Sequence, residues 1–117
     1  VVSELVSKSN LNRLQKLPID VIVCGKNQVN LTKLLSILSK KGIKTILLEG
    51  GGTLNRSFLK KNLIDEMIIA LTPYVLGSKN TISLFEGISF PELKSKLPLK
   101  LKNVQKNDNE IILNYKF

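Results

Sequence analysis

Hydrophobic and polar residues follow a helical period in the first half of the chain. Between residues 31 and 41, leucines recur at the i, i+3, i+4 and i+7 positions, with lysine, serine and threonine between them. Asn30 is a suitable N-cap residue, and Gly42 stands where a helix commonly ends. The pattern predicts a helix over residues 31–41 that buries one leucine stripe.

Short unbroken apolar runs flank this helix on both sides. Residues 19–24 are rich in β-branched side chains, and residues 43–48 end in a continuous Ile-Leu-Leu run. Such runs are typical of strands covered on both faces of a sheet. A strand, a helix and a strand joined by short turns predict a βαβ unit, in which the two strands run parallel.

The remaining patterns predict smaller elements. They are a short helix at 10–17 stopped by Pro18, a helix at 53–61 that buries Leu54 and Phe58, a strand at 66–72, a turn at 77–80, and a hairpin of 100–105 with 110–117. Together they predict one α/β domain over residues 1–117. Its mixed sheet would have a parallel core and an antiparallel C-terminal hairpin.

The junction between the expected strand 43–48 and the next helix is the strongest functional signal. Glu49 ends the strand, and Gly50, Gly51 and Gly52 lead into the helix. Glycines let the backbone approach a ligand closely, and the first amides of a helix favour an anion such as phosphate. The segment is not a P-loop, and Asn55 replaces the third glycine of the dinucleotide fingerprint.

A plain strand–helix turn with glycine as filler is the alternative interpretation of this junction. Three successive glycines disfavour it, because each loses extra backbone entropy on folding and one would suffice for a turn.

Composition narrows the possible partners. The net charge of +9 favours anionic ligands, yet the lysines are dispersed and aromatic residues make up only 5% of the chain. We therefore expect a phosphorylated small molecule and no nucleic acid. The sequence contains no apolar run long enough to span a membrane and no signal-peptide pattern at residues 1–17.

The absence of histidine and the single cysteine exclude several kinds of site. Catalytic triads with histidine and the usual zinc sites need residues that this chain lacks, so we expect no metal. Cys24 is expected to be a small buried residue, and one cysteine cannot form an intramolecular disulfide. A reducing cytoplasm is the expected location.

Four short motifs occur in an order and spacing that is similar to a known family. They are Leu48-Glu49-Gly50-Gly51-Gly52-Thr53-Leu54, Leu63-Ile64-Asp65-Glu66-Met67, Thr72-Pro73 and Leu76-Gly77. Together they resemble the C-terminal half of the riboflavin-biosynthesis pyrimidine reductases, which belong to the dihydrofolate-reductase-like superfamily. The resemblance covers residues 18–117.

This resemblance implies a three-layer α/β/α fold and an NADPH-dependent reductase. The substrate would be a ribosylamino-pyrimidinone 5′-phosphate, whose ribosyl group is reduced to ribityl, and the enzyme would be a homodimer. Cofactor binding is implied for five residues, namely Gly50, Gly51, Gly52, Thr53 and Leu54. Substrate binding is implied for Glu49, while the catalytic residues stay unknown.

The family domain is longer than this chain, so residues 1–117 are expected to be its C-terminal part. The half that carries further strands and substrate-side groups would then be missing, and the fragment alone would be inactive. Three alternatives remain open: a dihydrofolate-type reductase, a non-catalytic nucleotide-binding module, and a basic nucleic-acid-binding domain.

Overall fold

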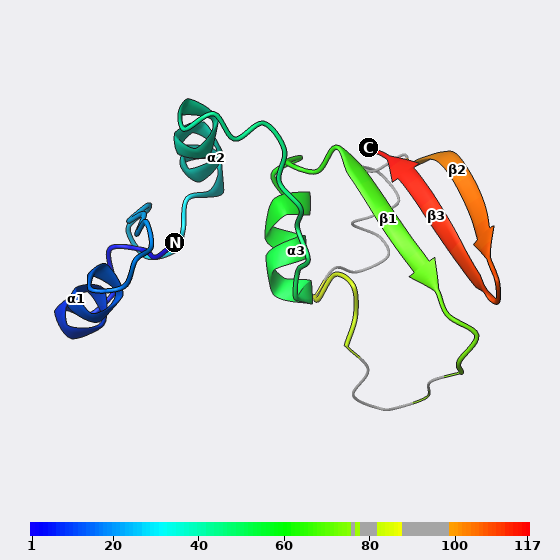
Figure 1. Ribbon diagram of the computed structural model, residues 1–117, viewed down its shortest axis with the longest axis horizontal. Coiled ribbons are helices and arrows are strands. Elements are labelled where there is room, and N and C mark those ends of the chain that lie inside the picture. The colour runs from blue at the N-terminus through cyan, green and yellow to red at the C-terminus, as the bar shows by residue number, and fades with distance from the viewer. Residues whose placement is uncertain (76, 78–81, 88–98) are drawn as a thin grey trace. The chain divides into compact units, whose positions relative to one another are not determined.

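The computed structural model describes residues 1–75, 77, 82–87 and 99–117. Leu76 and most of the turn expected at 77–80 therefore lie outside the described residues. The chain divides into two compact units, Val1–Leu47 and Leu48–Phe117. Figure 1 shows the elements of both units along the chain.

The first unit begins with a short extended segment and helix α1, Lys8–Gln15. The Ser7 side chain caps this helix by accepting a hydrogen bond from the Asn10 amide at 3.2 Å. Val2 forms an isolated parallel bridge with Val23. That bridge is the only strand-like pairing in the expected strand 19–24, so the prediction of a full strand there is wrong.

Helix α2, Leu31–Lys40, confirms the clearest helix prediction. The Asn30 side chain accepts a hydrogen bond from the Lys33 amide at 3.0 Å, as an N-cap should. At the other end Gly42 has a φ of 84°, and the Ile43 amide donates to the Leu38 carbonyl at 3.1 Å. This is a Schellman stop, which needs a left-handed residue that glycine supplies without strain.

The second unit contains helix α3, Gly52–Leu59, which begins one residue earlier than expected and ends two residues earlier. Its stop resembles that of α2, but Asn62 takes the left-handed position with a φ of 53°. The Leu63 amide donates to the Phe58 carbonyl at 3.1 Å, and the Asn62 amide donates to the Leu59 carbonyl at 3.0 Å.

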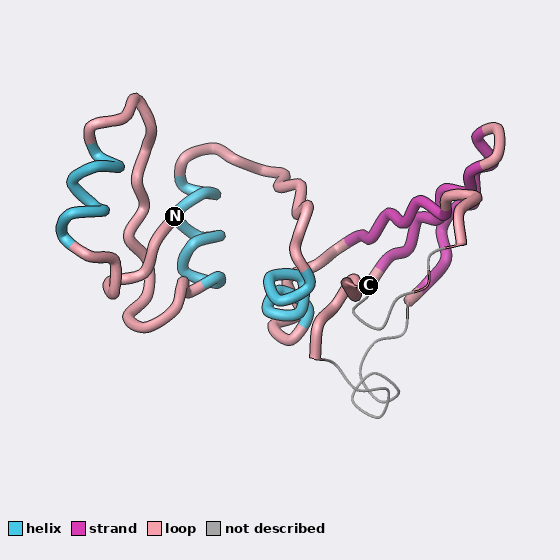
Figure 2. The backbone as a smooth tube through the Cα atoms, turned by 90° about the horizontal axis from the view of Figure 1, so that it is seen from below, coloured by secondary structure: helices cyan, strands magenta, loops and turns pink. Residues whose placement is uncertain are grey.

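The sheet of the second unit consists of three antiparallel strands in the order β1-β3-β2. They are β1, Glu66–Leu71; β2, Lys100–Asn107; and β3, Glu110–Lys116. The strands lie side by side in Figure 1 and Figure 2, with β3 in the middle. The predicted C-terminal hairpin is therefore confirmed, and Asp108 in its turn has a φ of 50°.

The chain thus has an α/β fold, but the parallel core is not part of the described structure. Residues 43–48 form no strand, so that prediction is wrong for this chain. The physical reason is that a strand exists only where its amides and carbonyls meet a neighbouring strand. Ile46 and Leu47 are correspondingly 45% and 80% exposed.

Among the described residues, few apolar side chains are fully buried in either unit. Cys24, Leu31 and Leu34 are buried in the first, and Phe58 and Leu59 in the second. The Cys24 side chain is 1% exposed, which confirms its interpretation as a small buried residue. None of the helices in the described ranges is long and apolar enough to cross a membrane.

Candidate functional site

The glycine loop, Gly50–Gly52, turns the chain into helix α3 through unusual backbone angles. Gly50 has a φ of 85° and Gly51 a φ of 55°, which are backbone angles that residues with a Cβ rarely adopt. Gly51 is the N-cap of α3, and Gly52 is its first residue. Glycine is therefore favoured at Gly50 and Gly51 on conformational grounds, which a plain turn would also explain, so the case for a ligand depends on the space around the loop.

The surroundings of the three glycines differ. A Cβ on Gly50 would lie 2.6 Å from the Asn55 side-chain nitrogen, and one on Gly52 would lie 2.5 Å from the Glu86 Cγ atom. A Cβ on Gly51 would meet nothing within 4 Å. Gly50 and Gly52 are thus packed against side chains of this unit, whereas Gly51 faces open space that a ligand could fill.

The start of α3 has the electrostatic character that an anion needs. The first amides of a helix have no acceptor within the helix, and the helix dipole places partial positive charge there. The helix has no acidic residue in its own first turn and Arg56 in its last turn, while the Glu86 carboxylate lies beside the first turn and accepts from the Thr53 hydroxyl. The open side of Gly51 and these amides together can accept a phosphate group.

Thr53 and Leu54 follow the glycines on the first turn of α3. The Thr53 hydroxyl donates to the Glu86 carboxylate, with 2.5 Å between the oxygens, and the Ser57 hydroxyl donates to the Thr53 carbonyl at 2.8 Å. Leu54 is 42% exposed, so the prediction that it is buried together with Phe58 is wrong. Its exposed side chain stands on the helix turn next to the glycine loop.

Glu49 precedes the loop and is exposed. Within the ranges that the structure describes, its carboxylate takes part in no ion pair, so nothing there supports a purely structural role in a salt bridge. A free carboxylate beside a glycine loop can orient a polar or cationic group of a ligand.

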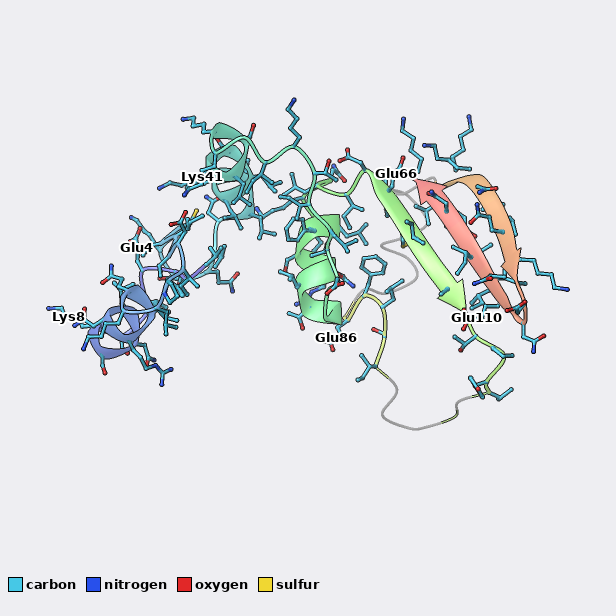
Figure 3. All side chains as sticks on the ribbon, viewed as in Figure 1. Glu4, Lys8, Lys41, Glu66, Glu86 and Glu110 are labelled. Carbon is cyan, nitrogen blue, oxygen red and sulfur yellow. The ribbon has the colours of Figure 1, made fainter. Side chains whose placement is uncertain are left out.

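Asn55 and the segment 82–87 were not predicted to belong to this site. The Asn55 side-chain nitrogen donates to the Leu84 carbonyl at 2.9 Å, while its buried side-chain oxygen lacks a partner in the described part of the chain. Sequence patterns singled out Asn55 only as a departure from the dinucleotide fingerprint. Figure 3 shows Glu86 beside the first turn of α3.

The described residues contain no group of three or more histidine, cysteine, aspartate or glutamate side chains that could hold a metal ion. The two carboxylates whose pKa values are lowered, Asp20 and Glu66, lie outside the glycine loop. Each pKa is lowered by a lysine: Lys41 for Asp20 and Lys102 for Glu66. The loop itself therefore offers main-chain amides and the Glu49 carboxylate as its binding groups, while the Thr53 hydroxyl donates its one proton to Glu86.

Comparison with known proteins identifies relatives that match most of the chain. The model of the RibD C-terminal domain family matches residues 1–113. The chain is 34% identical over 101 residues to the 2,5-diamino-6-ribosylamino-4(3H)-pyrimidinone 5′-phosphate reductase of Aquifex aeolicus. This match covers 86% of this chain and 45% of that protein. It is 32% identical over 114 residues to the protein of the same name from Methanothermobacter thermautotrophicus, covering 97% and 52%. The chain thus spans about half the length of these curated relatives.

Solved structures give a consistent result. RibD from Acinetobacter baumannii matches with a TM-score of 0.68 and 31% identity, covering 95% of this chain and 29% of that one. A pyrimidine reductase-like protein from Corynebacterium diphtheriae matches with a TM-score of 0.78 over 99% of this chain and 48% of that one. Its identity of 19% makes this second match a likeness of fold alone.

Proposed function

The chain belongs to the RibD C-terminal domain family, and from this membership we propose that the protein carrying it is a reductase of riboflavin biosynthesis. The substrate would be a ribosylamino-pyrimidinone 5′-phosphate, the compound class in the names of the two reductases described above. The reaction would reduce the ribosyl group to ribityl. Residues 1–117 would form the C-terminal part of one reductase domain.

The observation that carries this proposal is the glycine loop at the start of α3, together with the family match. We propose that the loop holds the diphosphate of NADPH on the main-chain amides of Gly51 and Gly52, with Thr53 and Leu54 beside it. Open space at Gly51 and the dipole of α3 support the fit, because both favour close approach of an anion.

When bound, NADPH would supply a hydride to the substrate. The residues of this chain would bind the cofactor and fix its position, since hydride transfer depends chiefly on orientation and exclusion of water. Glu49 would stand on the substrate side of the loop, where its carboxylate could hold a ribose hydroxyl or stabilise positive charge at the reacting carbon. No histidine is needed for this role.

The same proposal accounts for the lack of strand partners at residues 43–48 in the described structure. We infer that residues 43–48 become a strand when the rest of the domain supplies neighbours on both sides, which would create the parallel core of a three-layer fold. Ile46 and Leu47, now 45% and 80% exposed, would then be covered. The chain alone would lack the substrate-side groups other than Glu49 and would not convert the substrate.

The test is an assay of the natural full-length protein with NADPH and the pyrimidine phosphate. We expect oxidation of NADPH, followed by its absorbance, and formation of the ribityl product. Oxidation with dihydrofolate instead would favour a dihydrofolate-type reductase. Binding of NADPH without turnover of any substrate in a heterocycle panel would contradict the reductase and favour a nucleotide-binding module.

A further inference from the structure

Segment 82–87 is far from the glycine loop in sequence but contacts the loop and the start of α3 through several hydrogen bonds. Residues 82–87 contact the first turns of α3, and Figure 3 shows Glu86 at the N-terminal end of that helix. The Glu86 amide donates to the Gly52 carbonyl at 3.2 Å, and its carboxylate accepts from the Thr53 hydroxyl at 2.5 Å. Both of its partners are residues proposed to contact the cofactor.

Two further contacts anchor the segment on either side of Glu86. The Asn55 side chain donates to the Leu84 carbonyl at 2.9 Å. After Glu86, Gly87 has a φ of 64° and lies against the Arg56 guanidinium. A Cβ on Gly87 would be only 2.6 Å from a guanidinium nitrogen, so glycine leaves room for this side chain. The segment therefore contacts four of the five residues from Gly52 to Arg56, all except Leu54.

The packing at Gly52 shows how closely the two parts fit. Gly52 is buried, and a Cβ there would lie 2.5 Å from the Glu86 Cγ atom and 2.6 Å from the Ser83 carbonyl oxygen. Asn55 at the same time lies against Gly50. Segment 82–87 therefore contacts the glycine loop directly at Gly52 and indirectly through Asn55, which touches both Gly50 and Leu84. A displacement of the segment would disturb the loop.

We propose that Glu86 is a positioning residue for the cofactor loop: its amide fixes Gly52, and its carboxylate fixes the hydroxyl of Thr53. This inference rests on the proposed function, because it assigns Glu86 to the same NADPH site. Glu86 itself need not contact the cofactor. By holding the start of α3 in one arrangement, it reduces the ordering that binding would otherwise require.

The test compares NADPH dissociation constants of Glu86→Ala, Glu86→Gln and Thr53→Val in the full-length protein. Loss of one hydrogen bond predicts that Glu86→Ala weakens binding by roughly threefold to tenfold. Glu86→Gln retains an acceptor oxygen and should restore most of the affinity. The double variant Glu86→Ala/Thr53→Val should bind no more weakly than the weaker single variant, because both remove the same contact.

Two controls separate a positioning role from a general loss of structure. Glu4→Ala removes an exposed carboxylate from the other unit and should leave the dissociation constant unchanged. Hydrogen exchange of the peptide that contains residues 50–56 should accelerate in Glu86→Ala but not in Glu86→Gln. A variant that merely unfolds would instead show faster exchange throughout the chain.

Each other outcome overturns a defined statement. Unchanged affinity in Glu86→Ala, with binding still abolished by Gly51→Val, would reject the role of Glu86 and leave the proposed function intact. Tighter binding in both Glu86 variants would also reject it, because the carboxylate would then be repelling the cofactor phosphates. Absence of NADPH binding in the unaltered protein would reject both proposals.

Discussion

At the scale of single residues, backbone angle and local space decide what each position tolerates. Gly51 and Asn62 both have left-handed φ angles, of 55° and 53°, yet only one of them is glycine. Gly51 faces open space at the proposed binding loop, whereas Asn62 ends α3 through the hydrogen bonds of its stop. A substitution at the first should act on ligand binding, and one at the second on stability.

The Gly51→Val variant is expected to lose NADPH binding while the protein remains folded. A side chain would occupy the open space at the loop, and the left-handed φ would add strain of about 1–2 kcal/mol. Isothermal titration with NADPH, together with a urea unfolding curve, measures both effects. Retained affinity in a folded variant would contradict the placement of the cofactor phosphates.

Asn62→Gly is expected to stabilise the protein, by about 0.5 kcal/mol, because glycine adopts the left-handed conformation without steric cost. Asn62→Ala is the matched control, since it also removes the side-chain carboxamide but keeps a Cβ. It should destabilise the protein by about 1 kcal/mol. Urea unfolding measures both variants. Equal stability of the two would show that the φ of Asn62 carries no cost.

At the scale of elements, those with local signals in the sequence were predicted well. The cap at Asn30 and the left-handed Gly42 lie next to the helix that they delimit, so α2 was found within one residue. The hairpin of β2 and β3 was likewise found because its strands are joined by a short turn. The prediction of a strand at 43–48 was wrong, because an apolar run gives no information about which strands pair with it.

An ion pair joins the two outer strands of the described sheet. The Lys102 ammonium on β2 lies 2.8 Å from the Glu66 carboxylate on β1 and lowers the pKa of that carboxyl below its ordinary value of 4.5. A carboxyl with a lowered pKa in the folded state stabilises the fold above its unfolded pKa. This stabilisation is lost as the pH falls through the folded value.

The Lys102→Gln variant should therefore be slightly less stable than the unaltered protein at pH 7, and this difference should disappear at acidic pH, below 4.5. Lys100→Gln on the same strand is the control, since that side chain forms no ion pair with another described residue. Thermal unfolding at a series of pH values measures both. A difference that persists at low pH would contradict the ion pair as its source.

At the scale of the whole molecule, the chain exposes apolar side chains that the proposed longer reductase domain would cover. The chain spans about half of its curated relatives, and Ile43, Ile46 and Leu47 are exposed. The loop residues Gly50–Gly52 could be predicted from sequence, because the motif is local. The contacts of Asn55 with Leu84 and of Thr53 with Glu86 could not be predicted, because their partners are 29 and 33 positions apart in the chain and no local pattern indicates such long-range contacts.

Leu47 provides a test of this explanation. In the isolated chain Leu47 is 80% exposed, so Leu47→Ser should change the free energy of unfolding by less than about 0.5 kcal/mol. In the full-length protein the same change should cost about 2–3 kcal/mol, because the side chain would be buried in the sheet core. Lys44→Ser is the control and should have little effect in either. Equal, small effects of Leu47→Ser in both proteins would contradict a central strand at 43–48.

The order of the described strands also bears on how this sheet could grow. With β3 in the middle, both β1 and β2 present one row of backbone groups without a partner strand in the described structure. Lysines recur along β2, at 100, 102 and 106, and lysine on an outer strand discourages the addition of another chain. The sequence of β1, Glu-Met-Ile-Ile-Ala-Leu, has no lysine. Further strands would therefore join at β1, and the lysine-rich hairpin would remain the border of the completed sheet.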